Sequence, residues 1–191
     1  MFCKTILSLI VLAVVGIEAQ SDRGTVPNLR PECYVGRWYQ MYTNFWSNLA
    51  ASLPNPTCVT ADYGAISATN VTVYNAFYDL ETQEGDYISG YAFIPDVNDP
   101  GKLRVSLEGV PVFGFYWIFK LGPIYRGLYE YSLVTDNVDR TLFILARDPE
   151  RFRQMYEAEV LEYVRLIGFT DERRAPEEVP HTAGCIYPPT Q

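Results

Sequence analysis

NVTVYNAFYDLETQEGDYISGYAFI, residues 70–94, contains two runs rich in β-branched and aromatic residues, Asn70–Asp79 and Asp86–Ile94. Between them, residues 81–85 are polar turn formers that end in a glycine. Apolar runs of this length, bounded by turn residues, predict two antiparallel strands joined by a short loop. The stretch therefore indicates a β-hairpin.

The same pattern extends outward from this hairpin in both directions, with turn-forming clusters about every 10 to 15 residues. Six further strands are predicted, at Gly36–Thr43, Thr57–Gly64, Lys102–Leu107, Phe115–Leu121, Leu128–Thr135 and Arg140–Ala146. This number of short strands is typical of an all-β sandwich or barrel. Because short loops join neighbouring strands, we expect an antiparallel up-and-down meander. One longer connection, residues 44–56, is apolar and is placed to close over the mouth of a barrel.

The hydrophobic period changes from two to 3.6 after the last predicted strand. Asp148 is a suitable N-cap, Pro149 suits the first helical position, and Gly168 is the expected stop. One face of this segment is apolar, with Phe152, Met155, Tyr156, Val160, Tyr163, Val164 and Ile167. The pattern predicts one C-terminal amphipathic α-helix packed on the outside of the strands, followed by a tail rich in proline and charge.

The first residues have the pattern of a secretory signal. Lys4 precedes the apolar run Thr5–Ile17, and Ala19 is a small residue suited to cleavage after it. The run has about 13 residues, whereas a membrane-spanning helix needs about 20. We therefore expect residues 1–19 to be a signal peptide, residues 20–191 to form a single domain, and the protein to be secreted without a membrane span.

The composition excludes several classes of function. The net charge of −8 argues against a nucleic-acid partner, because contacts to phosphates need clustered Lys and Arg. The one histidine, His181, lies in the tail, and neither Gly-x-Ser-x-Gly nor His-Glu-x-x-His is present. Asp136, Asn137 and Asp139 are better explained as turn residues than as a calcium loop. We predict no enzyme, metal site or cofactor; Cys33 is the one candidate nucleophile, with no histidine or cation placed to activate it.

Two blocks at the ends of the strand region resemble those of the lipocalin family. They are Gly36-Arg37-Trp38-Tyr39, in the first strand, and Ala146-Arg147-Asp148-Pro149, at the end of the eighth. Finer matches point to the apolipoprotein D and crustacyanin branch, namely Cys58–Tyr63, Val71–Asn75 and His181–Cys185. The resemblance covers essentially all of the expected mature chain, and it implies a barrel that carries a small hydrophobic ligand.

The resemblance assigns structural roles to three residues of these blocks. Trp38 would plug the closed end of the barrel, Arg147 would stack on its indole, and Gly36 would let the backbone approach closely. The family's second block, Thr-Asp-Tyr after the sixth strand, is absent, and residues 120–127 stand in its place. We therefore expect the loop at the closed end to be rebuilt.

Three cysteines remain after removal of the expected signal: Cys33, Cys58 and Cys185. In an oxidising compartment an odd number predicts one disulfide and one thiol, and the residues alone leave three pairings open. The family resemblance implies the Cys58–Cys185 pair, which leaves Cys33 free.

The resemblance also predicts which side chains face a ligand. With Arg147 pointing inward at the closed end, strand alternation places Phe143 inside as well. The other predicted ligand-binding residues are Tyr63, Val73, Asn75, Phe77, Ile88, Ala92, Val105, Trp117 and Tyr131. For Tyr63, Trp117 and Tyr131 both faces of the strand are apolar, so alternation alone does not decide their orientation.

Eight strands enclose room for one small ligand, of lipid, steroid, fatty-acid, retinoid or carotenoid class. The alternative is that side chains largely fill the barrel and the protein acts through its surface, as a protein-interaction or pigment-complex subunit. Trp46 and a spare thiol would then support a homo- or hetero-oligomer. Asn70-Val71-Thr72 is the one acceptable glycosylation sequon, which makes Asn70 a predicted glycosylation site.

Overall fold

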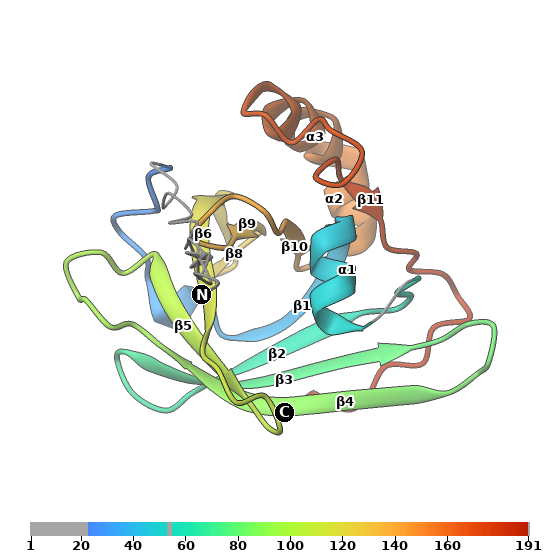
Figure 1. The fold of residues 1–191 in the computed structure, drawn as a ribbon, viewed down its shortest axis with the longest axis horizontal. Coiled ribbons are helices and arrows are strands. Elements are labelled where there is room, and N and C mark those ends of the chain that lie inside the picture. The colour runs from blue at the N-terminus through green and yellow to red at the C-terminus, as the bar shows by residue number, and fades with distance from the viewer. Residues whose placement is uncertain (1–22, 53–54, 191) are drawn as a thin grey trace, which may run out of the picture.

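A computed structural model describes residues 23–52 and 55–190; the expected signal, residues 1–19, lies outside this part of the chain. Eight strands form a closed antiparallel barrel (Figure 1). In chain order they are β1 (Gly36–Thr43), β2 (Thr60–Ala65), β3 (Asn70–Tyr78), β4 (Gly85–Phe93), β5 (Lys102–Leu107), β6 (Gly114–Leu121), β9 (Tyr131–Thr135) and β10 (Phe143–Ala146). Each pairs with the next, and β10 pairs with β1 to close the barrel. The predicted fold class is therefore confirmed.

Two strands begin later than the pattern predicts. β2 begins at Thr60 rather than Thr57, because Cys58 has a φ of 53°, a left-handed conformation that a strand does not accept. β10 begins at Phe143 rather than Arg140, because the Asp136 carboxylate accepts hydrogen bonds from the backbone N–H groups of Arg140 and Thr141. These bonds hold the preceding residues in a turn.

The predicted strand over residues 128–135 is divided at Glu130. Its first part, β8 (Leu128–Tyr129), pairs with β7 (Ile124–Tyr125) in a separate hairpin, and only β9 belongs to the barrel. The backbone N–H of Glu130 donates to the Pro123 carbonyl oxygen at 3.0 Å, which closes the base of this hairpin. The division was not predicted because the aromatic and apolar run continues through it.

The apolar connection after β1 contains a short helix, α1 (Phe45–Ala51), where the sequence predicted a loop. Asn44 caps this helix, since its side-chain oxygen accepts a hydrogen bond from the Ser47 backbone N–H at 3.0 Å. The left-handed Ser52 ends it. Side chains of α1 line the interior of the barrel, so the helix forms part of the wall at the mouth.

The single predicted C-terminal helix is two helices, α2 (Pro149–Met155) and α3 (Glu157–Leu166), separated by Tyr156. Asp148 caps α2 as predicted, accepting a hydrogen bond from the Arg151 N–H at 3.0 Å. Tyr156 leaves helical geometry, with a φ of −127°, and its ring packs 5.3 Å from that of Tyr131 on the barrel wall. Both helices lie beside the barrel near β10 (Figure 1).

The chain builds two apolar cores, one on each face of the barrel wall. The inner core fills the closed end of the barrel and includes Trp38, Ile118 and Val134. The outer core lies between the wall and the C-terminal helices; its fully buried members include Ile144, Phe152, Met41, Leu133, Val160 and Val164. The wall between these cores is therefore apolar on both of its faces.

The tail is fixed to the barrel beyond α3. A short strand, β11 (Glu177–Glu178), pairs with Tyr42 and Thr43 of β1. A 3-10 helix, η1 (Pro31–Cys33), precedes β1 at the other end. In the part of the chain that the structure describes, no helix has the length and apolar character needed to cross a membrane.

Candidate functional site

The barrel encloses a cavity of about 1000 Å³ that opens at one end. Tyr34, Tyr63 and Tyr116 lie at its inner end, while α1, the start of β4 and the loops after β5 and β9 surround the mouth. The walls between these ends are mainly aliphatic. The side chains therefore leave a ligand-sized space, and the alternative of a largely filled barrel does not match the structure.

Eight of the ten predicted ligand-binding residues line this cavity. They are Tyr63, Val73, Asn75, Phe77, Ile88, Ala92, Val105 and Phe143. Alternation along the strands carried seven of these predictions, because residues two apart on a strand share a face, whereas both faces of the strand around Tyr63 are apolar. Leu103, Leu107 and Leu145, which share strand faces with Val105 and Phe143, also line the cavity.

Trp117 and Tyr131 do not line the cavity, so their predicted inward orientation is wrong. Trp117 lies on the outer face of β6, where the Lys102 ammonium sits 4.7 Å from its ring centroid. Tyr131 lies on the outer face of β9 and packs against Phe152 and Tyr156. The helices and the loops bury the outer faces of these strands, so apolar residues occur on both sides and the pattern cannot distinguish them.

Tyr34, Gln40, Ser47 and Tyr116 line the cavity although the sequence analysis did not select them. Gln40 had a usable signal, because it lies two residues after the inward-facing Trp38 on β1 and shares its face. Tyr116 lies opposite Leu103 in the β5–β6 ladder, a register that only the structure gives. Tyr34 and Ser47 lie outside the barrel strands, where alternation gives no information.

The polar groups at the inner end are phenols that form one hydrogen-bonded chain. The Tyr63 hydroxyl donates to the Tyr116 hydroxyl at 3.0 Å, and Tyr116 shares a hydrogen bond of 2.8 Å with Tyr34. Tyr34 in turn lies 2.9 Å from the Ser132 hydroxyl. Burial raises the pKa of Tyr34 to about 12 and also raises the pKa values of Tyr63 and Tyr116, so all three phenols stay neutral.

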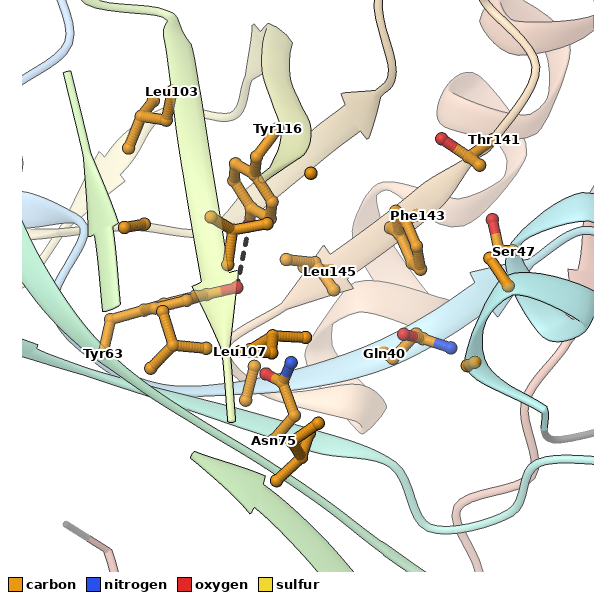
Figure 2. Close-up of a pocket in the computed structure, with 18 of the residues that line it drawn as sticks. Gln40, Ser47, Tyr63, Asn75, Leu103, Leu107, Tyr116, Thr141, Phe143 and Leu145 are labelled. Carbon is orange, nitrogen blue, oxygen red and sulfur yellow. Dashed lines mark hydrogen bonds between the residues drawn. The ribbon is translucent and has the colours of Figure 1, made fainter. Parts of the chain in front are cut away.

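Two amides face the middle of the cavity, as Figure 2 shows for Gln40 and Asn75. Among the described residues, neither side-chain amide has a hydrogen-bond partner. An amide that faces a cavity keeps access to solvent or to a ligand, so this arrangement avoids the cost of burying it unpaired. Both groups are available to a polar atom of a bound molecule.

The closed end beneath the cavity is held by Trp38 and Arg147, as predicted. The Arg147 guanidinium lies 3.7 Å from the Trp38 ring centroid and donates hydrogen bonds to the carbonyl oxygens of Arg37, Tyr34, Cys33 and Tyr129. The Trp38 indole N–H donates to the Tyr34 carbonyl oxygen at 2.8 Å. Burial lowers the pKa of Arg147 to about 10, which leaves it charged at neutral pH. Gly36 has a φ of 92° and lies against the guanidinium.

The predicted disulfide is present. Cys58 and Cys185 are joined with a Cα–Cα distance of 5.5 Å, and Cys33 is a free, buried thiol. The bond ties the C-terminal tail to the residue that precedes β2, and the Cys58 N–H also donates to the Pro180 carbonyl oxygen.

Comparison with known proteins agrees with this architecture. A family model described as a lipocalin-like domain matches residues 31–173. The chain belongs to the lipocalin family. The Lazarillo protein of Schistocerca americana is 32% identical over 123 residues, which are 60% of this chain and 54% of that protein. This lipocalin therefore spans about half the length of its curated relative.

Solved structures share the fold at low sequence identity. Japanin from Rhipicephalus appendiculatus, bound to cholesterol, is 15% identical with a TM-score of 0.54, and the match covers 83% of this lipocalin and 100% of Japanin. The tryptamine complex of the amine binding protein of Rhodnius prolixus is 14% identical with a TM-score of 0.53, covering 83% and 85% of the two chains. At these identities the likeness concerns the fold.

The rebuilt loop of this lipocalin supports its closed end. The β7–β8 hairpin occupies the connection between β6 and β9, where the second family block was absent from the sequence. The Tyr129 hydroxyl of this hairpin accepts a hydrogen bond from the Arg30 N–H at 3.1 Å, and the Tyr129 carbonyl accepts one from Arg147. The substitute loop is therefore packed against the Trp38–Arg147 pair.

Membership of the lipocalin family points to binding rather than catalysis. His181, in the tail, lies 3.0 Å from the Gln40 carbonyl oxygen and 2.8 Å from the Tyr187 hydroxyl, on the outside of the barrel. Among residues 23–52 and 55–190, no three His, Cys, Asp or Glu side chains gather as a metal ion would require. The described residues form an apolar cavity with a few hydrogen-bonding groups that could hold a small molecule.

Proposed function

We propose that this lipocalin is a secreted carrier that binds one small hydrophobic ligand in its barrel and catalyses no reaction. The observation that carries the proposal is the open, mainly apolar cavity of about 1000 Å³. Small-molecule sites are typically pockets of about 300–1,000 Å³ with apolar walls and a few placed polar groups. Burial of apolar ligand surface would drive binding at about 25 cal/mol per Å².

The ligand class proposed from the cavity is lipid, steroid, fatty acid, retinoid or carotenoid. We propose that Tyr63, Val73, Asn75, Phe77, Ile88, Ala92, Val105 and Phe143, which line the cavity, contact the ligand. Proteins of the same fold solved with cholesterol or tryptamine are compatible with a carrier role. Secretion is supported by the signal-like residues 1–19 and by the disulfide, since disulfides persist in oxidising compartments.

Three finer proposals accompany the carrier role. We place the chain in the apolipoprotein D and crustacyanin branch, on the sequence matches around Cys58 and Cys185 and on the disulfide that joins them. Asn70 is proposed to be glycosylated, and a glycosidase would then lower the intact mass of the secreted protein. A homo- or hetero-oligomer is proposed through the exposed aromatics near Trp46, to be checked by size-exclusion mobility.

The test is native mass spectrometry of the secreted protein, followed by solvent extraction and identification of any released molecule. We expect one apolar molecule per chain. Ala92→Phe, which adds a ring inside the cavity, should lower occupancy, whereas Ser89→Phe on the opposite face of β4 should not. An empty protein whose tryptophans are not quenched by retinol, progesterone or palmitate would contradict the carrier role.

A further inference from the structure

Four hydroxyl groups at the inner end of the cavity form a hydrogen-bonded chain, and they carry one proton more than the hydrogen bonds within the chain require. The chain runs Tyr63, Tyr116, Tyr34, Ser132, with three hydrogen bonds of 3.0, 2.8 and 2.9 Å. Figure 2 shows the side chains of Tyr63 and Tyr116 converging inside the barrel. Each hydroxyl carries one proton to donate. Four protons therefore serve three hydrogen bonds, and one remains without an acceptor in the chain.

The surplus proton can be presented to the cavity. The Tyr63 hydroxyl donates to Tyr116, while the other two bonds can run in either direction. If Ser132 donates to Tyr34 and Tyr34 donates to Tyr116, the Tyr116 hydroxyl accepts both bonds and its own proton is free. Tyr116 lines the cavity, whereas Ser132 is fully buried in the wall. A ligand oxygen at the inner end would receive this proton.

The described residues that line the inner end offer hydrogen bonds but no charged side chain. Arg147 lies beneath the lining, where its guanidinium donates hydrogen bonds to four backbone carbonyl oxygens and stacks on the Trp38 ring, so it is not placed to pair directly with a ligand. Burial raises the pKa of Tyr116 well above its ordinary value, which keeps the phenol a neutral donor. A carboxylate placed here would lose its hydration and would find no cationic side chain in the lining with which to form an ion pair.

The charges that line the cavity belong to its mouth and are mainly negative. Asp86, Glu108 and Asp136 are the acidic lining residues, and they lie at the strand ends and loops around the opening. Among the described lining residues Arg140 is the one cation, and it lies 5.5 Å from the Trp46 ring centroid. An anionic ligand would therefore meet mainly like charge at the entrance and no cationic side chain in the described lining of the inner end.

We propose that the Tyr63–Tyr116–Tyr34 chain selects an uncharged ligand that carries a carbonyl or hydroxyl oxygen and enters the barrel with that oxygen first. The inference rests on the proposed carrier function and narrows its ligand class to neutral alcohols, ketones and aldehydes on an apolar body, excluding free fatty acids. The apolar body lies along the aliphatic wall between the phenols and the mouth.

The first test compares two probes that share one apolar body. Retinol and retinoic acid are titrated into the full secreted chain at pH 7.5, and binding is followed by quenching of tryptophan fluorescence. We expect retinol to bind about tenfold or more tightly, because the acid must bury a carboxylate without a counter-ion.

The second test removes the donor hydroxyl. Tyr116→Phe should weaken retinol binding about three- to tenfold, which corresponds to the loss of one neutral hydrogen bond, and should narrow the gap to retinoic acid. Tyr91→Phe is the matched control, because Tyr91 is exposed on the outer face of β4 and should leave both affinities unchanged. Tyr116→Met, which also removes the donor hydroxyl and keeps an apolar side chain, gives a second measurement if Tyr116→Phe fails to fold as judged by near-UV circular dichroism.

The outcomes separate this inference from the carrier role. Equal affinity for retinol and retinoic acid, or tighter binding of the acid, would overturn the selection of a neutral ligand while leaving the carrier role intact. Retinol binding that is unchanged in a folded variant lacking the Tyr116 hydroxyl would overturn the role of the phenol chain. Failure of every apolar probe, whether neutral or acidic, would overturn the carrier role and this inference with it.

Discussion

The closed end of the barrel and its mouth are built on opposite principles. At the closed end the Arg147 guanidinium donates hydrogen bonds to four backbone carbonyl oxygens, and the fully buried Trp38 donates its indole N–H to the Tyr34 carbonyl oxygen. At the mouth Trp46 is only partly buried, and the lining residues Asp86 and Glu108 are exposed. Saturated hydrogen bonding and close packing give a single rigid arrangement, whereas open groups leave room for a ligand.

The difference teaches where stability and where binding are encoded. Residues at the closed end should control the free energy of unfolding, because each of them is packed and paired. Residues at the mouth and along the cavity wall should change ligand binding with little effect on folding. Five measurements would sharpen or break this division.

The largest effect is expected from Trp38→Ala. Truncation of a fully buried tryptophan typically costs about 3–5 kcal/mol, and here it also removes the ring on which Arg147 stacks. Trp46→Ala at the mouth should cost about 1–2 kcal/mol, because this ring is only partly buried. Denaturant unfolding monitored by circular dichroism measures both. Equal losses in the free energy of unfolding for the two variants would show that the closed end contributes no more to stability than the mouth.

Removal of the Cys58–Cys185 disulfide should have the next largest effect. The bond closes a sequence separation of 127 residues, and its loss should lower the free energy of unfolding by about 2–4 kcal/mol. The double variant Cys58→Ser/Cys185→Ser should unfold at a lower denaturant concentration than the oxidised protein. Cys33→Ser is the control, since this thiol makes no disulfide. A transition that reductant does not move would contradict the expectation.

A smaller change in the free energy of unfolding should distinguish a polar side chain that has a hydrogen-bond partner from one that has none. Ser132→Ala should lower the free energy of unfolding by about 1 kcal/mol, because it removes the buried partner of the Tyr34 hydroxyl. Asn75→Leu should leave that free energy unchanged or raise it by up to about 1 kcal/mol, since the described residues give the amide no partner to lose. Thermal unfolding of both variants and of the unaltered protein measures these changes in the free energy of unfolding. A clear decrease for Asn75→Leu would show that the cavity wall also contributes to stability.

The smallest effect is a pH dependence from the tail. Burial lowers the pKa of His181 from its ordinary 6.5, so the unfolded chain binds the proton more readily than the folded one. The free energy of unfolding should therefore be higher above pH 6.5 and fall as the pH drops below it. His181→Gln should flatten this difference between pH 7.5 and pH 5.5. Parallel profiles for the two proteins would exclude His181 as its source.

The closed end should contribute no pH dependence in the same window. The pKa of Tyr34 is raised to about 12 and that of Arg147 is lowered to about 10, so neither group titrates between pH 5.5 and 7.5. The loss caused by Trp38→Ala should accordingly be the same at both pH values. A loss that changes with pH would mean that a titrating group is coupled to the closed end.

Several parts of the molecule could be predicted because local chemistry decides them. Alternation with a period of two predicted the strands and seven of the cavity-lining side chains, and Asp148 with Pro149 predicted the start of α2. The Trp38–Arg147 contact and the Cys58–Cys185 bond followed from the family resemblance, and the structure confirms both. In each case a short motif or a simple period was sufficient.

Other parts could not be predicted because distant residues decide them. The orientation of Trp117 and Tyr131 depends on the helices and loops that bury the outer wall, and Tyr156 divides the helix where its ring meets Tyr131. β8 is separated from β9 by the contact between Glu130 and Pro123. None of these contacts can be recognised from the hydrophobic period of the sequence.

The sequence by itself determined that this chain forms an antiparallel barrel with a plugged end and apolar walls, because alternation and the two terminal blocks act locally. Only the tertiary structure decided that the barrel holds a cavity of about 1000 Å³ and that Tyr63, Tyr116 and Tyr34 meet inside it. These tyrosines come from β2, from β6 and from the segment before β1. Their hydroxyls are brought together by the closure of the barrel, a long-range event that no local pattern records.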